Sequence, residues 1–174
     1  MKILVIGSGG REPAIVRKLK ESPLVEALYC APGNGGISRD AECFPVNAMD
    51  KEGMLALAQE KQVDLVFVAP DDPLAAGMVD FLEEAGIPCF GPNAAAAQIE
   101  ASKVFSKNLM KRYGIPTAQY EVFADPAAAL AYCQAQGKYP VVIKADGLAL
   151  GKGVVIAQNE EEAKAALHSI MEDK

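Results

Sequence analysis

The sequence predicts an α/β protein, with a parallel α/β domain over residues 1–92 and a small α+β module after it. Short apolar runs alternate with helical patterns up to residue 92, which is typical of parallel strands joined by crossover helices. Loops rich in glycine and proline follow these runs. The chain has 174 residues, 51% of them hydrophobic and 23% charged, which suits one large domain or two small ones.

Five strands and their helices are expected in the N-terminal domain. In chain order, the apolar runs that predict strands are 3–6, 25–30, 43–46, 65–69 and 87–90, and helical patterns occupy 11–21, 50–61 and 74–85. Loops 7–10, 32–36, 70–73 and 91–93 follow the strands. Because ligands of an open α/β sheet bind beyond the carboxyl ends of its strands, we expect these loops to face one crevice.

A helical stretch over 94–113 comes next, and Gly114 and Pro116 are expected to end it. The remaining elements are predicted as strand 120–123, helix 126–136, strand 141–145, strand 153–157 and helix 160–171. The three acids at 160–162 suit the positive end of the last helix and are not expected to bind metal. This order describes a small α+β module in which a glycine-rich loop joins two central strands.

Composition excludes several classes of function. The net charge of −6 argues against a nucleic-acid-binding surface. No apolar run is long enough for a membrane span or a signal-peptide core, so we expect a cytoplasmic protein without membrane contact. The four cysteines form no Cys-x-x-Cys pair, which favours free thiols over disulfides or metal ligands. His168 is the only histidine and lies on a charged helix; this excludes a histidine metal cluster and a Ser-His-Asp triad.

The glycine-rich loop 147–153 indicates ATP binding. Two β-branched runs surround it, and Lys144 and Lys152 frame it. Glycines let backbone N–H groups approach phosphate oxygens, and the lysines neutralise phosphate charge. The loop is not a Walker A motif, because its first glycine is one residue too close, Gly153 replaces the Mg²⁺-binding hydroxyl and a strand follows. A plain glycine-rich hairpin turn is the alternative.

The loop after the first strand resembles a dinucleotide fingerprint but lacks two of its parts. Glu12 stands where the third glycine would fall, and strand 25–30 ends without the acid that binds an adenine ribose. NAD is therefore not expected. Free N–H groups around Gly9 and Gly10, with Arg11, still form an anion site at a helix N-terminus. The alternative is an ordinary strand-to-helix turn with Arg11 in solvent.

Seven motifs, taken together, resemble the phosphoribosylamine–glycine ligase (glycinamide ribonucleotide synthetase) family of the ATP-grasp superfamily over nearly the whole chain. They lie at 5–12, 31–34, 73–77, 91–92, 102–107, 115–118 and 144–154. The strings Gly9-Gly10-Arg11-Glu12 and Lys144-Ala145-Asp146-Gly147-Leu148-Ala149 are the specific ones. The resemblance implies a Rossmann-like pre-ATP-grasp domain that binds substrate (1–92), a helical linker belonging to the ATP-grasp core (93–116) and an incomplete ATP-grasp lid subdomain (117–174).

The resemblance also implies the reaction, a step of purine biosynthesis. ATP would phosphorylate the glycine carboxylate, and the amine of 5-phosphoribosylamine would attack the acyl phosphate to give glycinamide ribonucleotide, ADP and phosphate. The implied ATP-binding residues are Lys103, Lys144, Asp146, Gly147, Leu148, Gly151, Lys152, Gly153 and Val154. The implied residues around the sugar phosphate are Gly9, Gly10, Arg11, Asn34, Pro70 and Asp71. Loop 147–153 would close over ATP as a lid, and no catalytic residue is assigned.

The chain departs from the family pattern at Pro13, where the family has histidine, and at Asp71, where it has glutamate. Asp71 and Asp72 are not expected to act as an acid/base pair, because adjacent loop residues rarely converge. The ligands of Mg²⁺ or Mn²⁺ and the glycine site are expected beyond Lys174, so the chain alone would be an N-terminal part, inactive without its C-terminal part. Two alternatives remain: another ATP-grasp carboxylate–amine ligase, such as a biotin-carboxylase-like enzyme, or a non-catalytic nucleotide-binding module.

Overall fold

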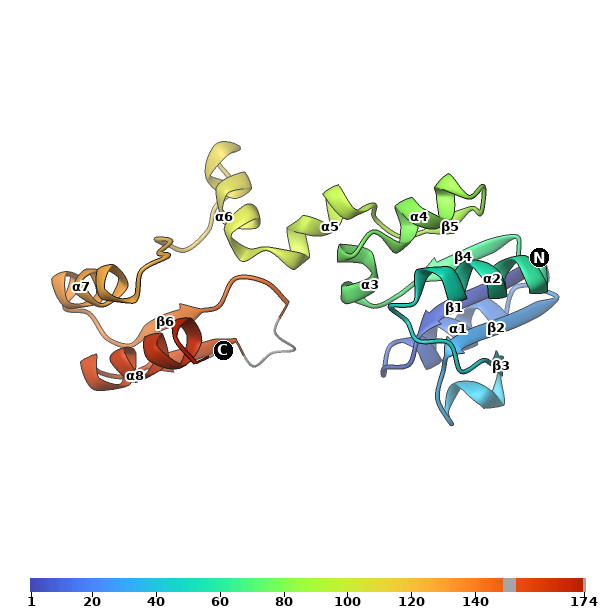
Figure 1. The fold of residues 1–174 in the computed structure, drawn as a ribbon, viewed down its shortest axis with the longest axis horizontal. Helices are drawn as coiled ribbons and strands as arrows, with labels where there is room; N and C mark the ends of the chain where they lie inside the picture. Colours follow the sequence, from blue (N-terminus) through green and yellow to red (C-terminus); the bar gives the residue numbers. More distant parts are fainter. Residues whose placement is uncertain (149–152, 174) are drawn as a thin grey trace. The chain divides into compact units, whose positions relative to one another are not determined.

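The computed structural model describes residues 1–148 and 153–173. The chain divides into two compact units, Met1–Gln98 and Ile99–Lys174, and the boundary falls inside helix α5 (Ala94–Ala101). Figure 1 shows the elements of each unit in chain order. The α/β fold class predicted from the sequence is confirmed.

A five-stranded parallel sheet forms the centre of the N-terminal unit, in the order β3-β2-β1-β4-β5. The strands are β1 (Lys2–Gly7), β2 (Ala27–Pro32), β3 (Glu42–Cys43), β4 (Leu65–Val68) and β5 (Cys89–Phe90). After β1, the strands β2 and β3 are added on one side of β1. The chain then crosses back, and β4 and β5 are added on the other side. The strand order thus reverses between β1 and β4, and such a switch point leaves a crevice at the carboxyl ends of the two strands.

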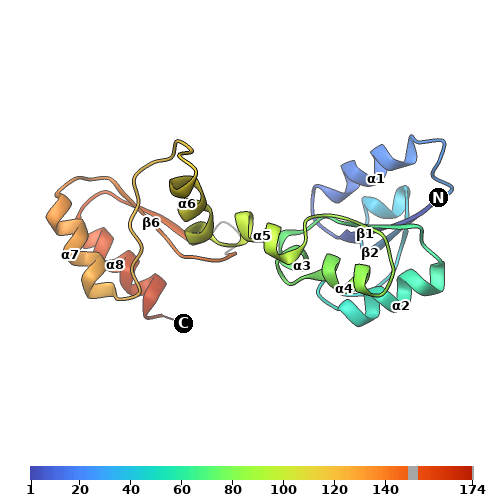
Figure 2. The same cartoon turned by 90° about the horizontal axis from the view of Figure 1, so that it is seen from above.

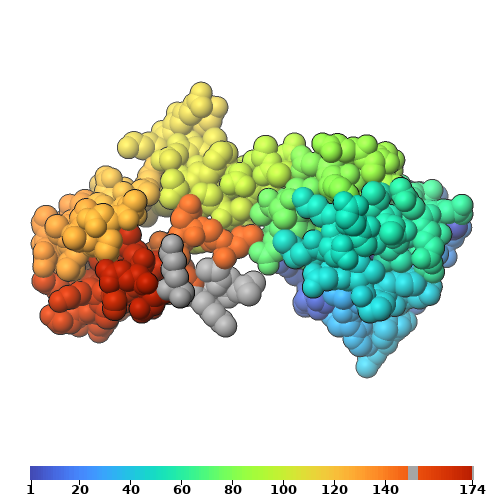
Figure 3. Space-filling view, in the orientation of Figure 1, coloured from blue at the N-terminus to red at the C-terminus, as the bar shows by residue number. Residues whose placement is uncertain are grey.

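The central strand β1 is buried on both faces. Ile3 and Val5 belong to a core cluster with Val16 of α1 (Glu12–Lys20), whereas Leu4 and Ile6 belong to a second cluster beneath α2 (Lys51–Lys61) and α4 (Met78–Glu84). Figure 2 shows α1 on one side of the sheet and α2 with α4 on the other, and in Figure 3 the side chains of α2 cover one of these faces. Such two-sided burial explains why the strands read as continuous apolar runs.

Several boundaries of the N-terminal unit differ from the sequence prediction. The predicted helix 74–85 is divided into α3 (Asp71–Ala75) and α4, because Gly77 adopts a positive φ of 81° between them. A 3₁₀ helix, η1 (Ile37–Arg39), was not predicted, and the edge strand β3 is shorter than the predicted 43–46.

The C-terminal unit contains an antiparallel pair, β6 (Val141–Lys144) and β7 (Val154–Ala157), with α8 (Glu160–Met171) packed against it and α7 (Pro126–Gln136) against α8. The predicted helix 94–113 is wrong as one element: it breaks into α5 and α6 (Lys103–Arg112). Ser102 lies at the break, where its hydroxyl accepts a 3.0 Å hydrogen bond from the backbone N–H of Phe105 and caps α6.

The predicted strand 120–123 is not formed in the described residues, and side chains of α6 bond to the stretch that leads into it. Lys107 Nζ donates to Thr117 Oγ1 at 2.7 Å and to the carbonyl of Ala118 at 3.1 Å. The Tyr120 hydroxyl donates to Asn108 Oδ1 at 2.8 Å.

All four cysteines are free, as predicted. Burial raises the pKa of the Cys30 thiol to about 12, with a further contribution from Cys43 and Glu12, and burial raises that of Cys89 to about 11. These two thiols are therefore protonated at neutral pH and have little nucleophilic character. Among the described helices, none has the length and apolar character needed to cross a membrane.

Candidate functional site

A cavity of about 270 Å³ lies at the switch point of the N-terminal sheet. The loop after β1 and the loop after β4 supply most of its walls, as expected for an open α/β sheet. Its lining residues are Gly7, Ser8, Gly9, Gly10, Arg11, Glu12, Ala48, Met49, Pro70, Asp72 and Pro73. The structure thus brings Gly9, Gly10, Arg11 and Pro70, four residues that the sequence predicts for the substrate site, to one cavity.

Arg11 lies just before α1 and interacts with Asp71, the first residue of α3. Arg11 Nη2 lies 3.4 Å from Asp71 Oδ2, and 68% of the Arg11 side chain is exposed. An ion pair this exposed contributes little to stability, so the guanidinium is free to exchange the carboxylate for a phosphate. A Cβ at Gly10 would meet nothing within 4 Å, so the loop is open at this residue.

The Asn34 side chain is hydrogen-bonded to the backbone of the glycine loop after β1. Its Nδ2 donates to the carbonyls of Ser8 at 2.9 Å and Gly9 at 3.3 Å, and its Oδ1 accepts from the backbone N–H groups of Gly36 and Ile37. These bonds tie the loop after β2 to the loop after β1. Asn34 is not among the residues that line the cavity, so the structure gives it a supporting place beside the predicted substrate site.

Glu12 lines the same cavity and was not predicted as a site residue. Its side chain is only 2% exposed, and its Oε2 has no hydrogen-bond partner among the described residues. A Cβ at Gly7 would lie 2.6 Å from Glu12 Oε1, and one at Gly9 would lie 3.0 Å from Oε2, so the carboxylate runs beneath the glycine loop. The sequence feature that could have identified Glu12 is its position, because it stands where the third glycine of a dinucleotide fingerprint would fall.

In the C-terminal unit, Lys144 and Val154 are register partners in the antiparallel pair. Both are exposed and lie on the same face of the pair as Val142 and Ile156, whose side chains are 51% and 57% exposed. The alternate residues face α8. The sheet therefore presents one ammonium group beside an apolar strip, a combination that suits phosphate and a planar base.

Asp146 fastens the start of the predicted ATP loop to α6. Its Oδ1 accepts from the backbone N–H of Val104 at 3.1 Å, and the Ser102 hydroxyl donates to its Oδ2 at 3.1 Å. Partial burial acts to raise the pKa of Asp146, but the hydrogen bonds from Val104 and Ser102 outweigh it and hold that pKa below its usual value. Asp146 is thus a second cap of α6.

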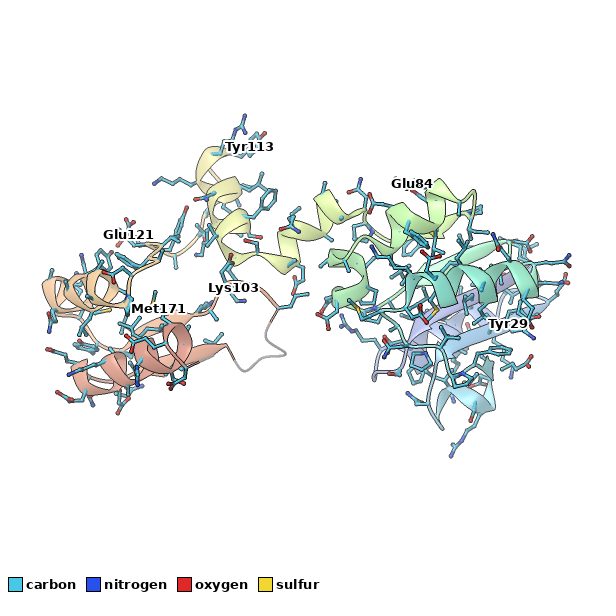
Figure 4. The ribbon with its side chains drawn as sticks, in the orientation of Figure 1. Tyr29, Glu84, Lys103, Tyr113, Glu121 and Met171 are labelled. Carbon is cyan, nitrogen blue, oxygen red and sulfur yellow. The ribbon has the colours of Figure 1, made fainter. Side chains whose placement is uncertain are left out.

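Lys103, the first residue of α6, also holds this loop. Its Nζ donates to the carbonyl of Gly147 at 2.7 Å, and Figure 4 shows the labelled Lys103 beside the stretch that follows β6. Leu148 is 37% exposed. The carbonyl of Gly153 accepts from the N–H of Ala145 at 2.8 Å and so continues the pairing of β6 and β7. Gly151 and Lys152 lie outside the described residues.

Within residues 1–148 and 153–173, no group of three or more His, Cys, Asp or Glu side chains is placed to hold a metal ion. His168 lies at the surface of α8, where its Nδ1 is 2.5 Å from Glu172 Oε2.

Two family models cover the chain. Residues 1–100 match the phosphoribosylglycinamide synthetase N domain, and residues 101–174 match the ATP-grasp (A) domain of the same synthetase. The phosphoribosylamine–glycine ligase of Agrobacterium fabrum is 52% identical over 167 residues, which are 96% of this chain and 39% of that protein. The chain spans about 40% of the length of the curated relatives it matches.

Solved structures of related proteins are also similar to this chain. The crystal structure of a phosphoribosylamine–glycine ligase from Thermotoga maritima is similar with a TM-score of 0.75 and 34% identity, over 95% of this chain and 38% of that one. An N5-carboxyaminoimidazole synthetase from Staphylococcus aureus, solved with ADP, has a TM-score of 0.78 over 98% of this chain and 45% of that one. At 17% identity, that similarity shows the shared fold alone.

Proposed function

The chain belongs to the phosphoribosylglycinamide synthetase family, and we propose that it supplies the phosphoribosylamine-binding domain and the ATP-covering module of a phosphoribosylamine–glycine ligase. The observation that carries this proposal is the match of both family models, one over each part of the chain. The free thiols fit the reducing cytoplasm, where we place the enzyme.

The reaction joins glycine to 5-phosphoribosylamine. The terminal phosphoryl group of ATP passes to the glycine carboxylate, which becomes an acyl phosphate. The amine then attacks the acyl carbon, and phosphate leaves as the amide of glycinamide ribonucleotide forms. An acyl phosphate must be kept from water until the amine arrives, so a cover over the site protects the intermediate.

The cavity of the N-terminal unit is assigned to the sugar phosphate. Backbone N–H groups at Gly9 and Gly10 and the guanidinium of Arg11 suit a phosphate at the start of α1. Binding would draw Arg11 away from Asp71, whose carboxylate is then free to accept a hydrogen bond from the ligand. Pro13, in place of the family histidine, sits in the first turn of α1, where proline is tolerated.

ATP is assigned to the exposed face of β6 and β7. Lys144 would contact the phosphates, Lys103 would exchange its bond to Gly147 for a phosphate oxygen, and the aliphatic strip beside Lys144 would contact the base. We place the ligands of Mg²⁺ or Mn²⁺ and the glycine site in the stretch of the relatives outside the matched region. The described residues do not fit a metal site, so no step is assigned to a metal held by them.

Titration calorimetry tests the substrate assignment. The chain is expected to bind glycinamide ribonucleotide and to bind NADH more weakly, because the dinucleotide fingerprint is incomplete. Tighter binding of NADH would contradict the proposal and favour a general nucleotide-binding module.

Turnover tests the reaction class. Purified chain is mixed with ATP, glycine and 5-phosphoribosylamine, with and without the C-terminal part of a curated relative supplied in trans, and ADP is measured. We expect ADP only with both parts present. Biotin with bicarbonate replaces the two substrates as a control, and turnover with that pair would instead favour a biotin-carboxylase-like ligase.

A further inference from the structure

We propose that Asp146 is a positioning residue for Lys103: its carboxylate fastens the start of α6 to the end of β6, so that the ammonium groups of Lys103 and Lys144 contact one triphosphate. The inference rests on the proposed function and deepens it, because it states how two phosphate-binding lysines from distant parts of the chain come to share a site. Asp146 acts on ATP through Lys103 and does not itself touch the nucleotide.

Both oxygens of the Asp146 carboxylate are engaged by the start of α6. Oδ1 accepts from the backbone N–H of Val104 at 3.1 Å, and the Ser102 hydroxyl donates to Oδ2 at 3.1 Å. The same hydroxyl accepts from the N–H of Phe105 at 3.0 Å. A carboxylate in this place is favoured by the positive end of the helix dipole. Asp146 therefore holds the first turn of α6 at the end of β6.

Strand alternation relates Asp146 to Lys144. Val142, Lys144 and Asp146 are exposed, and the two residues between them are half-buried. The N–H of Ala145 donates to the carbonyl of Gly153 at 2.8 Å, so the pairing of the two strands continues past Lys144. Side chains two residues apart on an extended stretch lie on the same face. The helix that Asp146 fastens thus begins on the face that carries Lys144.

Lys103 is held at both its backbone and its ammonium group. Its two chain neighbours, Ser102 and Val104, make the bonds to Asp146, and its Nζ donates to the carbonyl of Gly147 at 2.7 Å. A lysine side chain loses rotamer freedom when it binds phosphate, and this loss weakens binding unless the side chain is already ordered. Without Asp146, ATP itself would have to order Lys103.

The charge of Asp146 has the opposite effect from its position. A carboxylate near a phosphate site repels phosphate oxygens, so a role through charge alone predicts tighter ATP binding once the carboxylate is removed. The positioning role predicts weaker binding. A third role, as a ligand of the metal that accompanies ATP, would weaken binding only when the metal is present. The sign of the effect and its dependence on metal therefore separate the three roles.

The test is titration calorimetry with ATP in EDTA on the wild-type chain, Asp146→Ala, Lys103→Ala and the double variant. Lys103→Ala should weaken ATP by about tenfold, the effect of one lost charge-assisted contact. Asp146→Ala should weaken it by nearly the same factor, and the double variant by no more than Lys103→Ala alone, because both residues act through one contact. Factors that multiply in the double variant, or unchanged or tighter binding by Asp146→Ala, would overturn the inference.

Asp125→Ala is the matched control. Asp125 caps α7 in the same unit by accepting from the N–H of Ala128 at 2.8 Å, so its loss removes a capping aspartate far along the chain from Lys103. ATP affinity should stay at the wild-type value. If Asp125→Ala weakened ATP as much as Asp146→Ala does, the loss would reflect stability alone, and the positioning role would be rejected.

If Asp146→Ala does not fold, Asp146→Asn takes its place in the same set of variants. Asparagine keeps an oxygen for the N–H of Val104 but loses the charge that α6 favours, so ATP should bind about threefold weaker. Equal or tighter binding overturns the inference and leaves the proposed function standing. A wild-type chain that binds no ATP, or binding that Lys103→Ala does not change, contradicts the proposed ATP site and the inference with it.

Discussion

Gly7 and Glu12 occupy complementary space at the end of β1. Gly7 has a φ of 136°, a conformation that suits glycine, and a Cβ there would lie 2.6 Å from Glu12 Oε1. Glycine is thus required at position 7 by its backbone and by its neighbour. Gly10 has open space around its Cα and no such requirement.

We therefore expect Gly7→Ala to destabilise the N-terminal unit by about 1–3 kcal/mol, through backbone strain and the clash with Glu12. Gly10→Ala, as the matched control, should fold like the wild type. Gly10→Val should also fold but weaken glycinamide ribonucleotide, because a branched side chain stands where phosphate approaches. Urea unfolding gives the stabilities and calorimetry the affinity; a stable Gly7→Ala variant would contradict the packing argument.

Lys144 is the basic residue on the exposed face of β6. Its ammonium lies on the exposed face of β6, opposite Val154, with no structural task apparent in the described contacts. Lys144→Ala should therefore weaken ATP by about tenfold to a hundredfold, equivalent to about 1.5–3 kcal/mol for a charged phosphate contact, and leave the fold intact. Calorimetry with ATP measures the loss. Lys164→Ala removes an exposed lysine from α8 and should have no effect; ATP affinity that survives Lys144→Ala would remove Lys144 from the site.

At the scale of elements, the start of α6 and the stretch after β6 are one structure. Ser102 and Asp146 both cap α6, and Lys103 returns a bond to Gly147. The position of Lys103, a predicted phosphate contact, is thus set by a residue more than forty positions later in the chain.

Asp146→Asn should lower the free energy of unfolding of the C-terminal unit at neutral pH by about 0.3–1 kcal/mol, because asparagine keeps a capping oxygen but loses the negative charge that the start of α6 favours. The pKa of Asp146 is lowered on folding from its ordinary value of 3.8, so its contribution is present above that pH and lost as the pH falls through the folded value. The difference from wild type should therefore shrink below about pH 4. Glu121→Gln, an exposed loss of the same charge, is the control; a difference that persists at pH 3 would argue against this role.

At the scale of the whole molecule, the two units have unequal cores. The N-terminal unit buries large side chains such as Leu4, Ile6, Met54 and Leu82 completely. The buried hydrophobic residues described in Ile99–Lys174 are mostly alanines: Ala129, Cys133, Ala157, Ala163, Ala166 and Leu167. Because stabilisation by burial grows with the apolar area removed from water, the C-terminal unit is expected to be the less stable.

Hydrogen exchange followed by mass spectrometry measures this difference. Amides of β1 and β4 should exchange slowest, while those of α7 and α8 should exchange through more frequent local opening. Added ATP should slow exchange in the C-terminal unit, and glycinamide ribonucleotide should slow it in the loops after β1 and β4. Equal protection of both units without ligand would contradict the comparison of cores.

Local sequence patterns alone predicted the parallel sheet, its loops, the free thiols and the likeness to the ligase family. These depend on local patterns: apolar runs, turn residues and motif strings keep their meaning wherever the rest of the chain lies. Four of the six predicted substrate residues also reached one cavity, because loops that follow adjacent parallel strands meet at one edge.

Features that depend on partners distant in the chain could not be predicted from the sequence. The break at Ser102 involves Asp146, and side chains of α6 bond to Thr117 and Tyr120 near the stretch 120–123, which forms no strand in the described residues. The Asn34 side chain donates hydrogen bonds to the backbone of the glycine loop, and Glu12 is buried against Gly7. No local pattern encodes these contacts, because burial and hydrogen-bond choice follow from which segments meet in space, and packing then overrides local propensity.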